Sequence, residues 1–333
     1  GVDIFPETPA TELIIEDGKV VGVVAESEGE PLRVGGKAVV LATGGMGSNP
    51  ELIAKYSWFA PSAYNMNTLT PLQNMGDGLM MALSAGADDT NIVTCPILAA
   101  GARDKAMDSH IGAAGVQPGA IWINKTGRRF ANEGTAENIG DIGPLYGKQP
   151  DGIVWSVLDQ ANIDRLAENG SEISIGEFVV FGRPLDRLRM ELDQDVADGV
   201  AFAANTPEEL AEKIGVSPEN FAATVAAYNE ACAAGDDKEF FKQEKSLRPL
   251  SIPPFYAVAL ATGTMGSAGG IRINGNMQVV DKDYEPIPGL YAVGLDATGL
   301  YGDSYNMEVP GAANGFAHTS GRIAGRHFAA QQA

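Results

Sequence analysis

The sequence contains few of the residues that build metal centres and disulfide-bonded folds. Its 333 residues include two cysteines, Cys95 and Cys232, and three histidines, His110, His318 and His327. Two cysteines cannot form a disulfide framework or a zinc knuckle. Three histidines are also too few to indicate a His-rich metal site. We therefore expect no metal centre.

Basic residues and long apolar runs are scarce as well. The chain has 23 Lys and Arg against 43 Asp and Glu, a formal net charge of −20. An acidic surface repels phosphate backbones and anionic membranes, which argues against a nucleic-acid partner. No apolar run approaches the ~20 residues that span a bilayer. The length predicts two domains, because single cores stop growing near ~250–300 residues.

The motifs of several enzyme classes are missing. The sequence has no G-x-S-x-G, no H-E-x-x-H, no P-loop and no G-x-G-x-x-G. Among 43 acidic residues no pair of carboxylates can be singled out, so a glycosidase assignment would be arbitrary.

Glycine, by contrast, is abundant at 41 residues, with clusters at 44–45, 76–78, 263–270 and 311–315. Glycine is used where the backbone takes positive φ or approaches another group closely. The clusters lie in short loops between apolar runs. This pattern indicates either a cofactor held against loops or the turns of a loop-rich α/β protein.

The first 90 residues read as α/β. Strands are predicted at 11–15, 19–25 and 37–42, the first two joined by an Asp17-Gly18 hairpin turn and the last two by a Glu/Gly/Pro loop. A helix should begin at Asn49-Pro50. The chain starts in this predicted sheet without a methionine or a signal peptide. We therefore expect a piece of a longer protein, or a chain trimmed at a domain boundary.

The rest of the chain changes character twice. Gly76 to Gly78 opens a helix, and residues 91–263 then carry most of the charge, a strand at 120–124 and several helices. Residues 264–333 return to glycine-rich strands and end in a helix. The pattern predicts an α/β fold with an inserted α+β block.

Four segments together resemble the fumarate reductase/succinate dehydrogenase flavoprotein family, which includes urocanate reductases and ketosteroid dehydrogenases. They are residues 39–45 (VVLATGG), 76–78 (GDG) with 85–87 (AGA), 288–294 (PGLYAVG) and 321–325 (GRIAG). The resemblance covers nearly the whole chain. It implies a Rossmann-like FAD-binding domain interrupted by a mobile capping domain.

The resemblance implies the following domains: 1–90 and 264–333 as parts of the FAD-binding domain, and 91–263 as the α+β capping domain. In relatives, a further N-terminal stretch carries G-x-G-x-x-G and an acidic residue for the ADP half of FAD. This chain lacks both, so the resemblance implies a partial FAD-binding domain that holds the cofactor non-covalently.

Family contacts transfer onto several positions. Loop 43–45 would lie against the dinucleotide, loop 76–78 near the flavin and ribityl chain, and Asp296 at the ribityl hydroxyls. The helix that starts at Gly311 would direct its positive end at the flavin pyrimidine. The alternatives are that Thr43-Gly44 is only a strand-end turn, that Gly76 to Gly78 is only a helix start, and that Asp296 is an exposed loop carboxylate. The implied cofactor residues are Thr43, Gly44, Gly45, Gly76, Asp77, Gly78, Asp296, Gly311 and Ala312.

The substrate side departs from fumarate-reducing relatives. Cys95 takes the place of a histidine, Ala113-Ala114 of a Thr-Glu pair, Glu137 of the proton-donating arginine and Glu308 of a carboxylate-clamping arginine. At ~4 Å and an effective dielectric of ~20, each charge reversal is worth several kcal/mol. We therefore expect a substrate that is neutral or cationic there, rather than a simple dicarboxylate.

Other residues could supply the proton. In the ketosteroid dehydrogenase branch a tyrosine stands beside a similar Pro-Gly turn, which makes Tyr301 and Tyr305 candidates. They could equally be aromatic residues that pack the cap against the flavin domain. The predicted catalytic set is Tyr301, Tyr305, Glu137 and Arg103, and the predicted substrate-binding set is Cys95, His110, Glu308 and Gly311. The alternative is that Arg103 and His110 are polar loop residues without a role and that Cys95 is a small buried apolar residue.

The resemblance implies a flavin-dependent oxidoreductase that transfers hydride between FAD N5 and an activated C=C or CH–CH bond. Two alternatives stay open: fumarate reductase-type activity on a dicarboxylate, and a non-catalytic, cofactor-free fragment of a longer flavoprotein. Expected partners are a small-molecule substrate and an electron donor, either a haem or FMN module or a protein. The sequence indicates no compartment.

Overall fold

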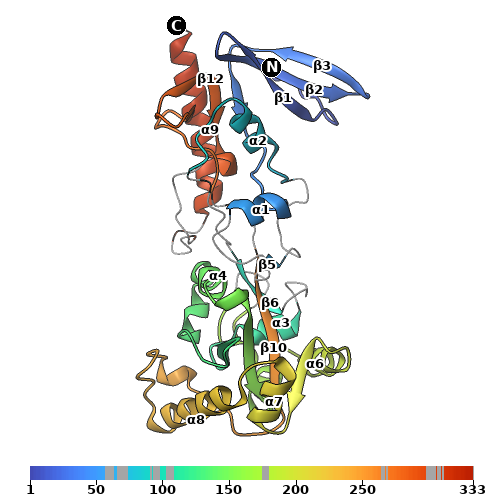
Figure 1. Cartoon of the computed structure of the whole chain (residues 1–333), viewed down its shortest axis with the longest axis vertical. Helices are drawn as coiled ribbons and strands as arrows, with labels where there is room; N and C mark the ends of the chain where they lie inside the picture. Colours follow the sequence, from blue (N-terminus) through green and yellow to red (C-terminus); the bar gives the residue numbers. More distant parts are fainter. Residues whose placement is uncertain are drawn as a thin grey trace. The chain divides into compact units, whose positions relative to one another are not determined.

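The computed structural model describes residues 1–56, 64–65, 74–90, 92, 98–102, 109–174, 180–263, 267, 269–297, 305, 309 and 311–332. The chain divides into two compact units, which are described one by one (Figure 1). Unit 1 comprises Gly1–Trp58, Leu69–Cys95 and Met265–Ala333, and unit 2 comprises Phe59–Thr68 and Pro96–Thr264. Each unit is thus assembled from segments far apart in the sequence.

Unit 1 begins with an antiparallel sheet of β1 (Ala10–Glu16), β2 (Lys19–Ser27) and β3 (Glu30–Gly35). The predicted turn joins β1 to β2, with positive φ at Asp17 and Gly18. The loop expected after β2 is instead strand β3. Only Leu32 and Val34 of this strand are apolar, and its other residues are Glu, Pro, Arg and Gly. The sequence pattern for a strand is therefore weak here.

A second sheet in unit 1 has the order β11-β12-β4. Its strands are β4 (Val39–Leu41), β11 (Gln278–Val280) and β12 (Pro286–Ala292). β4 runs parallel to β12, with Leu41 opposite Ala292. The carboxyl ends of these two strands therefore lie at the same edge of the sheet.

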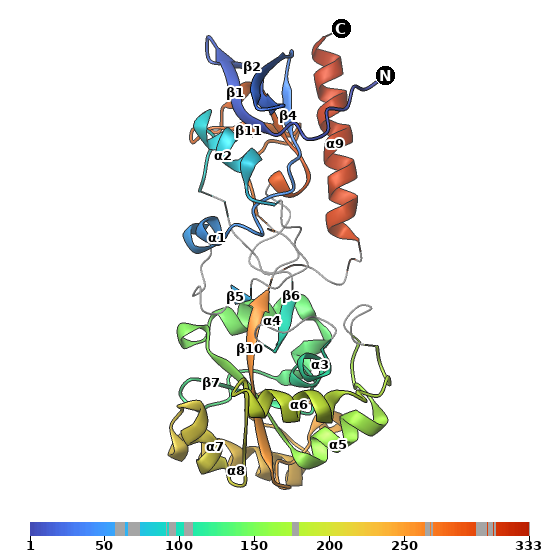
Figure 2. The ribbon, with the colours of Figure 1, turned by 90° about the vertical axis from the view of Figure 1, so that its right-hand side faces the viewer.

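The described residues of unit 1 also form the helices α1 (Pro50–Tyr56), α2 (Asp77–Ser84) and α9 (Ala312–Gln331). The Asn49 side chain accepts hydrogen bonds from the N–H groups of Glu51 and Leu52, as expected of the predicted cap. Helix α9 is the red helix of Figure 2. Its Ala324 packs in a small core with Tyr291 of β12 and with Val293, which directly follows β12.

Unit 2 is built around one six-stranded sheet. The central strand, β10 (Phe255–Gly263), pairs antiparallel with β8 (Val154–Asp159), β9 (Ala201–Ala204) and β6 (Leu98–Ala102), and parallel with β5 (Tyr64–Asn65). Strand β7 (Ile121–Asn124) pairs with β8 and confirms the strand predicted at 120–124. The sequence patterns did not identify β10, because its small apolar residues fit a helix or a strand.

Helices cover both faces of this sheet. Strand β7 places Trp122 in one core, with Tyr146, and places Ile121 and Ile123 in the other, with Phe221. The helices of unit 2 are α3 (His110–Gly115), α4 (Ile139–Gly147), α5 (Gln160–Asn169), α6 (Leu188–Ala197), α7 (Pro207–Ile214) and α8 (Pro218–Ala234).

Short 3-10 turns lie at Glu133–Glu137, Pro150–Gly152 and Glu244–Ser246 in unit 2, and at Gly294–Asp296 (η5) in unit 1. In the part of the chain that the structure describes, no helix combines the length and apolarity needed to cross a membrane. The predicted mixture of helices and strands is confirmed, whereas a capping role for residues 91–263 stays a prediction.

The hydroxyl of Tyr146 has no hydrogen-bond partner among the described residues. The ring is fully buried, edge-on to Trp122 at 5.2 Å between centroids, and burial holds the pKa of the phenol well above its usual value. An unpaired buried hydroxyl costs about 1–3 kcal/mol, so Tyr146→Phe should raise the free energy of unfolding by about 1 kcal/mol. Urea titrations of both proteins check this, and a clear loss of stability would contradict it.

Candidate functional site

Three loops of unit 1 meet at the carboxyl edge of the β4–β12 pair. They are the loop after β4, which holds Thr43 and Gly45, the start of α2 at Gly76 to Gly78, and η5, which ends at Asp296. Parallel pairing of β4 with β12 brings the first and last of these together, although Thr43 and Asp296 are 253 residues apart. The structure therefore brings these three predicted cofactor segments into one place.

The carboxylate of Asp296 connects these loops. Its Oδ2 accepts a hydrogen bond from the Thr43 N–H, and its Oδ1 accepts one from the Gly45 N–H at 3.0 Å. The Thr43 hydroxyl lies 3.0 Å from both carboxylate oxygens and itself accepts a hydrogen bond from the Gly78 N–H at 3.0 Å. The Asp296 carboxylate and the Thr43 hydroxyl thus form a continuous hydrogen-bonded chain.

Two glycines allow this close packing. A Cβ atom at Gly45 would lie 2.2 Å from the Ser267 hydroxyl, and one at Gly78 would lie 2.6 Å from the Thr43 hydroxyl. Gly45 also has a φ of +84°, which side-chain-bearing residues rarely adopt. Both positions therefore require glycine.

Asp296 is buried, with 1% of the residue exposed. The expected alternative of an exposed loop carboxylate is therefore wrong. Burial raises the pKa of Asp296, and the hydrogen bonds from Thr43 and from the Gly44 and Gly45 N–H groups offset this only in part. The donors that hold the Asp296 carboxyl group are thus all neutral.

Helix α9 begins at Gly311, whose φ is +77°. No described atom lies within 4 Å of the position that a Cβ there would take. The Ala312 N–H donates to the Val309 carbonyl at 3.2 Å, and the Ala313 N–H donates to the Tyr305 hydroxyl at 3.2 Å. Tyr305, which is 8% exposed, therefore caps the first turn of α9.

Two predicted substrate-side residues lie in unit 2. Glu137 forms an ion pair with Lys245 at 3.3 Å, and its side chain is 54% exposed. His110 is the first residue of α3, and its Nδ1 accepts a hydrogen bond from the Arg187 N–H at 3.0 Å. The predicted residues Cys95, Arg103, Tyr301 and Glu308 lie outside the described residues.

Ser267 is a site residue that the sequence analysis did not single out. It is 1% exposed, and its hydroxyl accepts a hydrogen bond from the Met46 N–H at 3.2 Å, next to Gly45. The only available signal was the glycine cluster at 263–270, which contains this serine but does not distinguish it from a loop residue.

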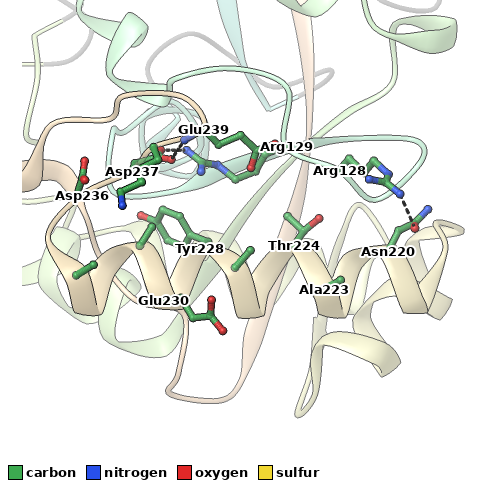
Figure 3. Close-up of a pocket in the computed structure, with 14 residues that line it drawn as sticks. Arg128, Arg129, Asn220, Ala223, Thr224, Tyr228, Glu230, Asp236, Asp237 and Glu239 are labelled. Atoms are coloured by element: carbon green, nitrogen blue, oxygen red, sulfur yellow. Dashed lines mark hydrogen bonds and ion pairs between the residues drawn. The ribbon is translucent and has the colours of Figure 1, made fainter.

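Unit 2 carries a separate open cavity of about 490 Å³ along α8 (Figure 3). Its lining includes Arg129 and Asp237, which lie 2.9 Å apart, and Tyr228, whose ring faces the Arg129 guanidinium at 4.9 Å. None of the predicted site residues lines this cavity. Of its charged groups, Arg129 is ion-paired with Asp237, and Arg128 donates a hydrogen bond to the Asn220 side chain at 3.2 Å.

Comparisons with known proteins identify the family of the chain. The model of the FAD binding domain family matches residues 1–310. The chain is similar to the vinyl phenol reductase of Lactiplantibacillus plantarum, with 34% identity over 99% of this chain and 68% of that protein. It is also similar to the NADH:acrylate oxidoreductase of Vibrio harveyi, with 31% identity over 97% of this chain and 30% of that protein.

Among solved structures, the chain resembles the 3-ketosteroid delta1-dehydrogenase of Sterolibacterium denitrificans in complex with 1,4-androstadiene-3,17-dione. The TM-score is 0.74 and the identity 25%, over 97% of this chain and 59% of that one. The chain thus spans only part of the length of the relatives that it matches. The predicted family and cofactor are confirmed: the chain belongs to the fumarate reductase/succinate dehydrogenase family of FAD-dependent oxidoreductases.

Proposed function

We propose that the protein to which this chain belongs reduces, or forms, an activated C=C bond in a substrate that is not a simple dicarboxylate. The observation that carries the proposal is the meeting of loops 43–45, 76–78 and 294–296 at one edge of a parallel strand pair. Three relatives named above are, by name, a vinyl phenol reductase, an acrylate oxidoreductase and a ketosteroid dehydrogenase.

The residues present fit a dinucleotide. In loop 43–45 Thr43 is exposed, whereas Gly45 and Gly78 are buried and leave no room for a Cβ, so the loop and the start of α2 pack closely against each other. The start of α9 offers open space at Gly311 and the positive end of a 20-residue helix. When bound, FAD supplies the hydride chemistry. The chain's own residues would orient it and, through α9, stabilise negative charge at the helix start.

Tyr305 is the described residue best suited to supply a proton. Its oxygen accepts the Ala313 N–H at 3.2 Å, which places the phenol at the first turn of α9. A donor on that oxygen at a positive helix end also stabilises the phenolate left after proton transfer. The second tyrosine candidate, Tyr301, keeps its place in the proposal from the sequence alone.

The acidic residues favour a substrate that is neutral or cationic near them. By the family resemblance, Glu137 and Glu308 take the places of arginines in fumarate-reducing relatives, and Glu137 is already paired with Lys245. In this proposal residues 91–263 form the cap that closes over the substrate and excludes water. Electrons reach the flavin from a haem or FMN module or from a protein partner.

The test begins with the visible absorption spectrum of the purified 333-residue chain, before and after FAD is added and the excess removed. A retained flavin band is expected. The flavin is then reduced without oxygen and mixed with a vinyl phenol, acrylate or fumarate. Reoxidation by the vinyl phenol should be at least about tenfold faster than by fumarate, which corresponds to about 1.4 kcal/mol of discrimination.

Two outcomes would overturn parts of this proposal. Equal or faster reoxidation by fumarate would assign the protein to dicarboxylate reduction. A colourless protein after FAD treatment would mean that this chain alone is a cofactor-free fragment, and the same assay would then be run on the longer parent protein.

A further inference from the structure

We propose that Asp296 is a positioning residue, whose carboxylate fixes the loop that contains Thr43 and Gly45 instead of contacting FAD itself. This inference rests on the proposed function, since the loop is taken to face the cofactor. It assigns Asp296 a role different from the ribityl contact that the family resemblance implies.

The first argument is hydrogen-bond saturation. The carboxylate of Asp296 accepts bonds from the N–H and hydroxyl of Thr43 and from the N–H of Gly45, so both of its oxygens are engaged. All these donors belong to the protein. A ribityl hydroxyl would have to compete with donors that the fold already places there.

The second argument is space. A Cβ at Gly78 would lie 2.9 Å from Asp296 Oδ2, and a Cβ at Gly270 would lie 2.4 Å from the Asp296 carbonyl oxygen. The carboxylate is therefore enclosed by the start of α2 on one side, and its backbone by the 269–270 segment on another. With 1% of Asp296 exposed, little of it is open to a ligand.

The third argument is energetic. Burial disfavours the ionised form of Asp296, and no cation compensates among the causes of its raised pKa. An ionised group with this balance adds little to the stability of the unit at neutral pH. Its contribution is to fix the conformation of the loop. The Thr43 hydroxyl, which bonds to Asp296, also accepts a hydrogen bond from the Gly78 N–H and so ties the loop to the start of α2.

The experiment compares Asp296→Asn, Thr43→Val, the double variant, and Thr43→Ser as a control that keeps the hydroxyl. Amide hydrogen exchange at Thr43 and Gly45 is measured without FAD, and FAD affinity is measured by flavin fluorescence. In Asp296→Asn one carboxylate oxygen is replaced by an NH₂ group, which cannot accept a hydrogen bond from the Thr43 or Gly45 N–H. The loss of one charge-assisted hydrogen bond should therefore speed exchange at these amides, and weaken FAD binding, by about tenfold or more.

If Asp296 acts through Thr43, the effects will not add. Thr43→Val and Asp296→Asn should each weaken FAD binding, the double variant should be little weaker than Asp296→Asn, and Thr43→Ser, which keeps the hydroxyl, should bind FAD more tightly than Thr43→Val. Additive losses, or unchanged exchange in Asp296→Asn together with lost FAD affinity, would show that Asp296 contacts the cofactor and would overturn the proposal.

Two safeguards keep the test decisive. If the wild-type chain binds no FAD, the proposed function fails for this chain, but hydrogen exchange at Thr43 and Gly45 still reports whether Asp296 holds the loop. If Asp296→Asn does not fold, the pair Thr43→Val and Thr43→Ser tests the same hydrogen bonds from the other side. Equal exchange at the Gly78 amide in that pair would then refute the positioning role.

Discussion

Glu133→Ala should lower the free energy of unfolding of unit 2 by about 3–5 kcal/mol, the usual cost of removing one partner from a buried ion pair. The Glu133 side chain is 0% exposed. Its carboxylate accepts two hydrogen bonds from Arg129, at 3.0 and 2.8 Å, and lies 3.2 Å from the Lys242 ammonium. The substitution would leave two buried cations with Asp237 as their remaining carboxylate neighbour in this cluster.

The same cluster predicts the direction of the pH dependence. Burial alone would raise the pKa of Glu133, but the charges of Lys242 and Arg129 outweigh it and hold this pKa below its usual value of 4.5. Stabilisation by the ionised carboxylate is therefore present above that value and is lost as the pH falls through the lower, folded-state pKa. The Glu133→Ala variant should lack this part of the acid sensitivity.

Urea unfolding followed by circular dichroism, at neutral and acidic pH, measures both effects. The matched control is Glu168→Ala. The Glu168 side chain is 65% exposed, and its carboxylate lies 2.7 Å from the Arg189 guanidinium. An exposed pair of this kind is worth about 0–1 kcal/mol. If both variants lose the same free energy of unfolding, the buried cluster stabilises unit 2 no more than an exposed ion pair does, and the prediction is wrong.

Tyr305→Phe should slow C=C reduction by about 10²–10⁴-fold, the usual contribution of a positioned general acid. The substitution removes the hydroxyl that accepts the Ala313 N–H, and with it the proposed proton. FAD affinity should change little, because the N–H groups at the start of α9 remain. The rate is read from reoxidation of the reduced flavin in a single turnover.

A matched control for this prediction is Tyr284→Phe. Tyr284 is 66% exposed, and its ring stacks on Arg272, so loss of its hydroxyl should leave the rate unchanged. A Tyr305→Phe protein that is less stable but reacts at the wild-type rate would assign Tyr305 to capping and packing alone. That outcome was one of the two alternatives open from the sequence.

Features set by local chemistry could be predicted. The Asp17-Gly18 turn and the Asn49 cap depend on residues within a few positions of one another. A capping side chain or a positive-φ glycine acts on its own neighbours, so its effect is visible in a short stretch of sequence. The family motifs likewise singled out loops 43–45 and 76–78, which the structure connects by a hydrogen bond.

Features set by distant contacts could not be predicted. The sequence placed Asp296 near the cofactor, but nothing in it shows that this carboxylate bonds to Thr43, 253 residues away. The partners of Arg129 were hidden for the same reason, since Asp237 lies 108 residues further on. A single charged residue in a sequence looks the same whether it is solvated or buried in an ion network.

The pairing of β4 with β12 also has a consequence for biosynthesis. Val39 to Leu41 reaches its partner strand only after residue 286 has been made, whereas Pro96–Thr264, the larger segment of unit 2, is complete earlier. Because domains generally fold as units during synthesis, unit 2 should acquire its structure on the ribosome first. Loops 43–45, 76–78 and 294–296 of unit 1 would then assemble last, when the final strands and α9 emerge.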